Sequence, residues 1–201
     1  MVLEGDTQWI TRPGQFVNIE LEGLYLRRPI SICDWDDKTI TIIYKVVGKG
    51  TEQMSQMQPG VELDVLTGLG NGFNPEPAVE NNKSLLVGGG VGVPPLYHLA
   101  KVLLAAGRKV SVVLGFNTAA EVFYADEFRA LGADVYVSTA DGSMGVKGFV
   151  TDAIREAAID FDYFYSCGPL PMLKALCGCT DKPGELSFEE RMGCGFGACM
   201  G

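Results

Sequence analysis

The sequence predicts two domains of different class: an N-terminal antiparallel β-barrel, then an α/β domain with a doubly wound parallel sheet and a cysteine-containing tail. Up to about residue 74 the chain is a series of short β-rich runs with no helical pattern between them. From about residue 84 apolar, β-branched runs alternate with helix-like stretches. The first pattern is typical of antiparallel barrels and sandwiches, and the second of a parallel sheet covered on both faces.

Each predicted element has its own signal. The N-terminal strands are the β-rich runs QFVNIEL, RRPISICDW, TITIIYKVVG and VELDVLTG, separated by turn residues. In the second half SLLVGGG, KVSVVLGF, ADVYVST and FDYFYSCG read as strands, and PLYHLAKVLLAAG, AEVFYADEFRALG and GFVTDAIREAA as helices. The Pro- and Asn-rich stretch NPEPAVENN predicts a linker near residues 75 to 83. We therefore expect domains at residues 1–78, 79–183 and 184–201.

The composition is that of a soluble globular protein, and its charge excludes two classes of partner. Hydrophobic residues make up 47% of the 201 residues, and the formal net charge is -9. Nucleic acid and anionic membranes need clustered Lys and Arg, so we expect neither as a partner. No run approaches the ~20 apolar residues of a membrane span. Glu4 and Asp6 stand where a signal peptide needs basic and then apolar residues, so we expect a cytoplasmic protein.

A glycine-rich loop follows the first strand of the α/β half. Residues 84–87 lead into GGGVGVPP, with glycines at Gly88, Gly90 and Gly92. Ligands of such sheets bind beyond the carboxyl ends of the strands, and glycines let the backbone approach a pyrophosphate. The helix that follows would direct free N–H groups at the same ligand. Because Pro95 stands where the dehydrogenase G-x-G-x-x-G carries glycine, a purely structural turn is the alternative.

Two further motifs connect this loop to a family. Cys167-Gly168-Pro169 ends a later strand and is expected at the same edge of the sheet, and Arg28 and Ser31 form R-x-x-S in the barrel. Together the three motifs resemble the ferredoxin-reductase family of flavin and nicotinamide enzymes. The resemblance implies that the barrel holds a flavin through Arg28 and Ser31, and that the α/β domain holds NAD(P)H. The alternative for Arg28 is a solvated charge on an edge strand.

Four stretches narrow the resemblance. They are RPIS, with Ile30 where many members carry Tyr, then IIYKVVGKGT, TGLGNGF and ERMGCGFGAC. Over nearly the whole chain they resemble the electron-transfer subunits of heteromeric, NAD-linked dihydroorotate dehydrogenases. In that family FAD is held by the segments that match Arg28-Pro29-Ile30-Ser31, Ile43-Tyr44-Lys45 and Gly50-Thr51.

The tail carries Cys194 and Cys199 in a glycine-rich segment. A plant-type ferredoxin loop runs C-x4-C-x2-C, and its third cysteine would fall just past Gly201. The resemblance implies that Cys194 and Cys199 are the first two ligands of a [2Fe–2S] cluster. The other two ligands are expected beyond Gly201, so the 201-residue chain should hold no stable cluster, because a [2Fe–2S] cluster needs four. The alternative is a flexible tail with two free thiols.

Both ends depart from the family pattern. Members have a further strand before the segment that matches Met1 to Gly5, and two more cysteines after Cys199. We therefore expect a chain trimmed at both ends, which leaves open whether the barrel closes and whether the cluster site is complete.

The implied function is electron transfer from NADH through FAD and a [2Fe–2S] cluster to an FMN-containing dihydroorotate dehydrogenase catalytic subunit in pyrimidine biosynthesis. We expect a hetero-oligomer, most simply a heterotetramer. No general base is needed, so we expect no catalytic side chain, and His98 reads as a structural residue within a helix. Two alternatives stay open. One is a related NAD(P)H–ferredoxin or sulfite-reductase electron-transfer subunit, and the other is a nucleotide-binding module without electron transfer.

NAD rather than NADP is expected as the nucleotide. After the second α/β strand the sequence offers Glu121, Asp126 and Glu127, and no Arg or Lys before Arg129 to meet a 2′-phosphate. The alternative for these carboxylates is a solvated helix face.

Overall fold

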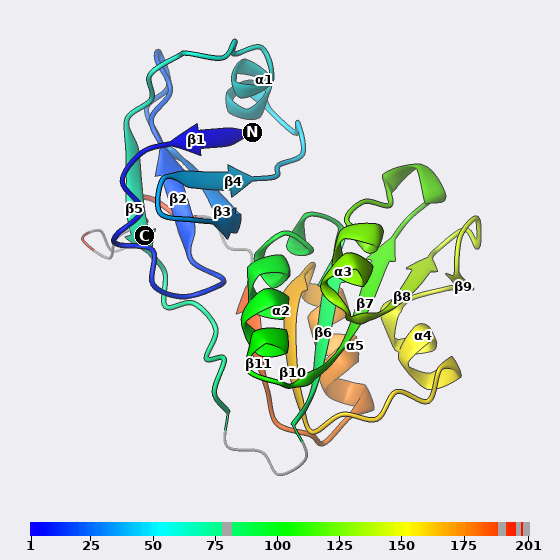
Figure 1. The fold of residues 1–201 in the computed structure, drawn as a ribbon. Helices are drawn as coiled ribbons and strands as arrows, with labels where there is room; N and C mark the ends of the chain where they lie inside the picture. The colour runs from blue at the N-terminus through cyan, green and yellow to red at the C-terminus, as the bar shows by residue number, and fades with distance from the viewer. Residues whose placement is uncertain (78–81, 189–191, 196–197, 199–201) are drawn as a thin grey trace. The chain divides into compact units, whose positions relative to one another are not determined.

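The chain divides into two compact units (Figure 1). The computed structural model describes residues 1–77, 82–188, 192–195 and 198. Unit 1 comprises Met1–Gly72 and Glu190–Gly201, and unit 2 comprises Phe73–Glu189. The functional division into FAD, NAD and cluster segments at 78/79 and 183/184 stays a prediction.

Unit 1 is built on a five-stranded antiparallel sheet in the order β1-β4-β3-β2-β5. Its elements are β1 (Val2–Glu4), β2 (Phe16–Ile19), β3 (Arg28–Trp35), β4 (Thr39–Ile42), α1 (Lys49–Ser55) and β5 (Val65–Leu69). Val17 and Ile19 of β2 are fully buried in a core that α1 joins through Met54. This confirms the antiparallel N-terminal domain that the sequence predicts.

Unit 2 is a six-stranded sheet in the order β11-β10-β6-β7-β8-β9, and every neighbouring pair is parallel. The strands are β6 (Lys83–Gly89), β7 (Lys109–Phe116), β8 (Asp134–Thr139), β9 (Val146–Lys147), β10 (Tyr163–Gly168) and β11 (Gly184–Phe188). The helical elements are η1 (Gly90–Gly92), α2 (Pro95–Ala105), η2 (Ala119–Glu121), α3 (Ala125–Leu131), α4 (Val150–Glu156) and α5 (Leu170–Cys179). The predicted doubly wound parallel sheet is confirmed.

Helices cover both faces of this sheet. Leu86 of β6 lies in the core shared with α2 and α3, whereas Leu85 and Val87 lie in the core shared with α4 and α5. This alternation is what a strand buried on both faces requires. Among the described residues, no helix has both the length and the apolar character needed to cross a membrane.

Several strands and α-helices were not predicted from the sequence. They are β1, α1, β9, α5 and β11. β11 matters most for the domain boundaries, because residues 184–188 pair in parallel with β10 at the edge of the unit 2 sheet. The third predicted strand of the barrel, TITIIYKVVG, also ends early, at Ile42.

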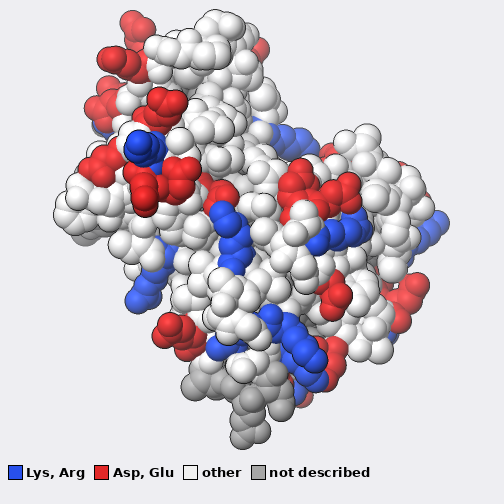
Figure 2. Space-filling view, viewed as in Figure 1, with Lys and Arg blue, Asp and Glu red and all other residues white. Residues whose placement is uncertain are grey.

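Charged side chains are mixed on the surface. On the face drawn in Figure 2, basic side chains are dispersed among acidic and uncharged ones. In unit 1, Arg27 pairs with both Glu20 and Asp64. The hydrogen bond from Arg27 lowers the pKa of Asp64. Exposed pairs of this kind contribute little to stability, because water screens them.

Candidate functional site

The glycine loop and the Cys167-Gly168-Pro169 motif meet at one point of the unit 2 sheet. β6 lies between β7 and β10, so the strand order reverses direction on either side of it. Cys167 of β10 is directly opposite Gly88 of β6 at the carboxyl ends of these strands. Open α/β sheets bind their ligands at such a switch point. The structure therefore brings together the two motifs that the sequence predicts for the nucleotide.

Gly92 is in contact with the second motif. A Cβ atom built on Gly92 would overlap the carbonyl group of Cys167 and lie 2.7 Å from the Cα atom of Gly168. These are backbone atoms, which cannot move aside cheaply. Close packing of two protein segments is thus one reason for glycine at position 92, beside the contact with a nucleotide that the sequence suggested.

Gly90 has a different environment. Its φ is +52°, in the left-handed region that favours glycine. A Cβ atom built on it would meet no protein atom within 4 Å. Gly90 therefore presents bare backbone to open space at the switch point, which is the arrangement that a closely approaching nucleotide needs.

The start of α2 does not offer the free N–H groups that the sequence suggested. Pro94 and Pro95 have no backbone N–H, and the N–H groups of Leu96 and Tyr97 donate to Val93 and Pro94 carbonyls at 3.1 and 3.0 Å. The prediction of free helical N–H groups is wrong at these four positions. A phosphate here would still meet the positive end of the helix dipole, and its backbone donors would come from the η1 loop.

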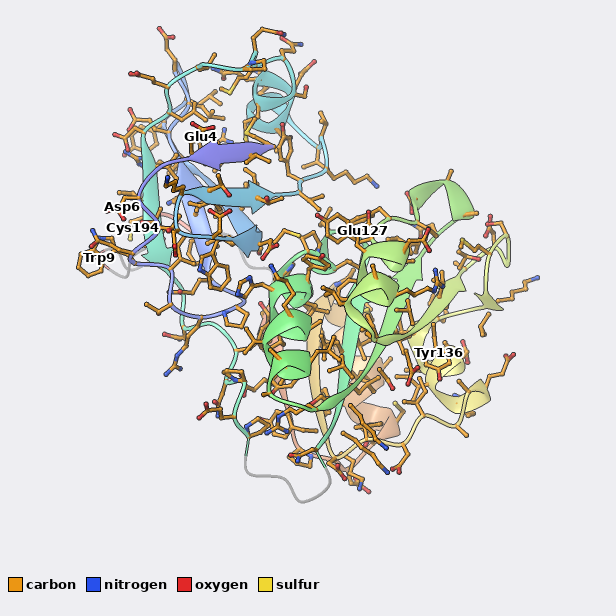
Figure 3. The ribbon with its side chains drawn as sticks, in the orientation of Figure 1. Glu4, Asp6, Trp9, Glu127, Tyr136 and Cys194 are labelled. Carbon is orange, nitrogen blue, oxygen red and sulfur yellow. The ribbon has the colours of Figure 1, made fainter. Side chains whose placement is uncertain are left out.

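The carboxylates predicted to favour NAD follow β7. Glu121, in η2, accepts hydrogen bonds from the backbone N–H and the side-chain amide of Asn117 at 3.1 and 2.9 Å. Asp126 pairs with Arg129 on the exposed side of α3. Glu127 extends from α3 into solvent (Figure 3). Glu121 is the one of the three that is held against the loop after the strand, where an acidic residue would meet a ribose.

In unit 1, Arg28 and Gly50 come together although 22 residues separate them in sequence. A Cβ atom on Gly50 would lie 2.9 Å from both Cδ and Cζ of Arg28, so the guanidinium rests directly on α1. Nη1 of Arg28 donates to the carbonyls of Leu26 and Arg27. Within the described residues only Nη1 is engaged, so Nε and Nη2 remain for a ligand acceptor. These features fit a phosphate group of FAD.

The pairing of β3 with β2 shows on which face of the sheet the residues of the RPIS segment lie. Ser31 pairs with Phe16, and Pro29 with Asn18, whereas Arg28 and Ile30 pair with the core residues of β2. Directly opposed residues share a face of the sheet, so Arg28 and Ser31 leave β3 on opposite faces.

Ile43-Tyr44-Lys45 lie directly after β4. Tyr44 packs against the unit 1 core, and burial raises its pKa. The hydroxyl of Thr51 accepts from the N–H groups of Val47 and Gly48 and fixes the start of α1.

Comparisons with known proteins agree with this arrangement. A family model described as "Oxidoreductase NAD-binding domain" matches residues 86–178. The "Dihydroorotate dehydrogenase B (NAD(+)), electron transfer subunit" of Shouchella clausii is 49% identical over 207 residues, which cover 100% of this chain and 80% of the relative. The subunit of the same name from Geobacillus kaustophilus is 52% identical, over 96% of this chain and 77% of the relative. The chain belongs to this family of electron transfer subunits.

Solved structures support the family's fold. A chain from work on "flavin-based electron bifurcation via the NADH-dependent reduced ferredoxin-NADP oxidoreductase structure" is 36% identical, with a TM-score of 0.82 over 94% of this chain and 70% of that chain. The "Flavohem-like-FAD/NAD Binding Domain of Nitric Oxide Dioxygenase" from Vibrio cholerae has a TM-score of 0.69 at 20% identity, and it shows the fold alone. The chain thus has the ferredoxin-reductase-like fold of its family of NAD-linked oxidoreductase subunits.

The structure describes residues 192–195 and 198 of the tail. Cys194 is half-buried, and its carbonyl oxygen accepts a 3.0 Å hydrogen bond from Nδ2 of Asn18 (Figure 3 labels Cys194). Cys199 lies outside the described residues. Among the residues that the structure does describe, no three His, Cys, Asp or Glu side chains form a metal-binding group. The described residues include one of the two predicted cluster ligands, Cys194, so the [2Fe–2S] assignment stays a prediction.

Asn18 is the residue near the tail that sequence reasoning missed. It lies in the middle of β2, and it is only 2% exposed. Asparagine is depleted in strands, so an Asn inside the run QFVNIEL was the available signal.

Proposed function

We propose that this chain takes electrons from NADH at the unit 2 switch point, through FAD held by unit 1. It then delivers them singly through a [2Fe–2S] cluster to the FMN-containing catalytic subunit of a dihydroorotate dehydrogenase. The observation that carries the proposal is the meeting of the glycine loop with Cys167 and Gly168 where the strand order reverses. The names of the relatives add the electron-transfer role and a partner subunit.

The chain's own residues would bind and orient the cofactors. FAD, when bound, supplies the chemistry of accepting two electrons as a hydride and releasing them one at a time. Arg28, seated on Gly50, would bind a flavin phosphate, and Gly90 would admit the nicotinamide nucleotide. Gly88, Gly92 and the Cys167-Gly168-Pro169 turn would shape the same loop. Cys194 and Cys199 would be two of the cluster ligands. Electrons would pass from the cluster in this segment to the partner subunit.

The rival functions share most of these parts. A ferredoxin- or sulfite-reductase electron-transfer subunit would carry the same flavin and nucleotide modules but deliver electrons to a different acceptor. Co-purification with an FMN-containing dihydroorotate dehydrogenase subunit separates the two. A module without electron transfer would bind nucleotide and remain colourless.

The experiment that tests the flavin site compares two neighbouring arginines. We expect purified protein to bind FAD, and Arg28→Ala to weaken that binding by roughly 1.5–3 kcal/mol, because it removes charge-assisted hydrogen bonds. Arg27→Ala is the matched control, since Arg27 pairs with Glu20 and Asp64 rather than facing Gly50. Titration of each apoprotein with FAD, followed by flavin fluorescence, gives the affinities. Equal affinities for the two variants would overturn the assignment of Arg28.

A further inference from the structure

Asn18 lies on the face of β2 that is turned away from the unit 1 core. Its neighbours Val17 and Ile19 are both fully buried in that core, and successive strand residues point to opposite faces. Asn18 should therefore face outward, yet it is only 2% exposed. Something other than the unit 1 core covers it.

The cysteine segment contacts Asn18 on this face. Nδ2 of Asn18 donates to the carbonyl oxygen of Cys194 at 3.0 Å. Gly195 follows with φ at +75°, and a Cβ atom on it would lie 2.9 Å from Nδ2 of Asn18 and 3.5 Å from Cε2 of Phe16. The hydrogen bond and the close approach of Gly195 are two separate signs that the tail backbone lies directly on β2.

This contact places the tail beside the proposed flavin strand. Asn18 is directly opposite Pro29 in the pairing of β2 with β3, and Phe16 is opposite Ser31. The four side chains therefore share one face of the sheet. Cys194 is thus anchored on β2, the strand adjacent to the RPIS segment of β3. It lies on the face of the sheet that carries Pro29 and Ser31.

We infer that Asn18 is a positioning residue that holds Cys194 at a fixed place beside the RPIS strand. The inference rests on the proposed function in one respect, that Cys194 is a cluster ligand. Residues that hydrogen-bond to metal-ligating residues orient them and hold the geometry of the site. Electron transfer slows steeply with distance, so a tail anchored on β2, next to the proposed flavin strand β3, suits a one-electron path.

The test measures the reactivity of individual thiols in the 201-residue chain. Protein is treated with an alkylating reagent for increasing times, and the labelled cysteine peptides are quantified by mass spectrometry. Cys33, which is fully buried in β3, reports general loosening of unit 1, and Cys177, which is exposed on α5, reports the reagent's intrinsic rate.

Asn18→Leu removes the donor while keeping a side chain of similar size. We expect it to raise the labelling rate of Cys194 roughly two- to tenfold, the fold-change that corresponds to one hydrogen bond. The rates at Cys33 and Cys177 should not change. A merely structural role for Asn18 would raise labelling at Cys33 as well, and that result would overturn the inference.

A second variant approaches the contact from the tail. Gly195→Ala would put a methyl group against Asn18, so it should raise Cys194 labelling to a similar extent even if Asn18→Leu fails to fold. The double variant should add little to either single change, because both break one contact. Thr7→Val is the control: it removes another side-chain hydrogen bond of unit 1, to the carbonyl of Asp36 at 2.8 Å, and should leave Cys194 unchanged.

The inference and the proposed function can fail separately, because the labelling test needs neither flavin nor cluster. Unchanged Cys194 labelling in both variants would refute the role of Asn18, whatever the cluster content. Raised labelling together with no iron or sulfide in the anaerobically isolated complex with the partner subunit would keep the anchor. That result would refute the cluster assignment alone.

Discussion

The two units form their candidate sites in different ways. In unit 2 the glycine loop is fixed by backbone against backbone, since Gly92 leaves no space beside Cys167 and Gly168. In unit 1 the corresponding feature is a side chain, Arg28, laid over the backbone of Gly50. The comparison teaches that substitutions at Gly92, the tightly packed position of the unit 2 loop, should affect folding before they affect ligand binding. Substitutions at Arg28 should do the reverse.

The largest effect is expected for Gly92→Ala. The new methyl group would overlap the Cys167 carbonyl, so we expect a loss of about 3 kcal/mol in the free energy of unfolding of unit 2. Gly178→Ala is the control in the same unit. Gly178 lies in helix α5, and a Cβ atom built on it meets no atom within 4 Å. It should stabilise by roughly 0.5–1 kcal/mol. Urea denaturation measures both, and equal stabilities would show that the backbone contact is not tight.

The next prediction distinguishes an effect on NADH binding from an effect on stability, using a glycine of the same loop. Gly90 and Gly107 both have positive φ, at +52° and +77°, and both have open space where a Cβ atom would lie. Alanine at either position should cost about 1 kcal/mol of stability through backbone strain. Only Gly90→Ala should also weaken NADH binding, by about tenfold or more, because only that methyl group would meet the nucleotide. Equal NADH affinities for the two variants, measured by titration, would contradict the assignment of Gly90.

A smaller effect on stability is expected in the core of unit 2. The hydroxyl of Tyr165, fully buried, donates to the carbonyl of Asn74 at 2.7 Å. Tyr165→Phe should therefore cost about 1 kcal/mol at neutral pH.

The same tyrosine predicts a dependence on pH. Burial is the main cause that raises the pKa of Tyr165, and Glu185 adds to it. Because the pKa is higher in the folded state, the contribution of Tyr165 to the free energy of unfolding is complete below the unfolded tyrosine pKa of about 10. It is lost as the pH rises above that value. The stability difference between wild type and Tyr165→Phe should accordingly shrink in alkaline urea titrations. Tyr163, whose pKa burial also raises, remains in both proteins and cancels from the difference. A stability difference between the two proteins that stays constant above pH 10 would contradict the raised pKa of Tyr165.

The sequence was sufficient for the fold class and for the position of the glycine loop directly after β6. The run KVSVVLGF is short, apolar and rich in β-branched residues, which is the pattern expected of a parallel strand buried on both faces. α1 was missed because its seven residues, KGTEQMS, contain a glycine and follow a strand-like run. β11 was missed because GELSF is short and only partly buried.

The role of each site residue depended on contacts between distant segments. Gly90 and Gly92 look equivalent in GGGVGVPP. In the structure Gly92 lies against Cys167, which is 75 residues later in the sequence, whereas Gly90 has a positive φ and open space beside it. Asn18 acquires its role from a tail more than 170 residues away, with a sequence separation of 176 to Cys194. Local patterns do not contain such information, whereas the family resemblance supplied the flavin and cluster assignments that remain predictions.

The most direct test of the account is anaerobic reduction of the flavin in the purified wild-type protein. We predict that the protein binds FAD, that NADH bleaches the visible flavin band within the mixing time or shortly after, and that NADPH does so far more slowly. Gly107→Ala should behave as wild type, and Gly90→Ala should retain FAD but be reduced slowly. Protein that remains colourless with added FAD, or bound FAD that NADH leaves oxidised, would contradict the central claim that unit 1 holds the flavin and unit 2 supplies its electrons.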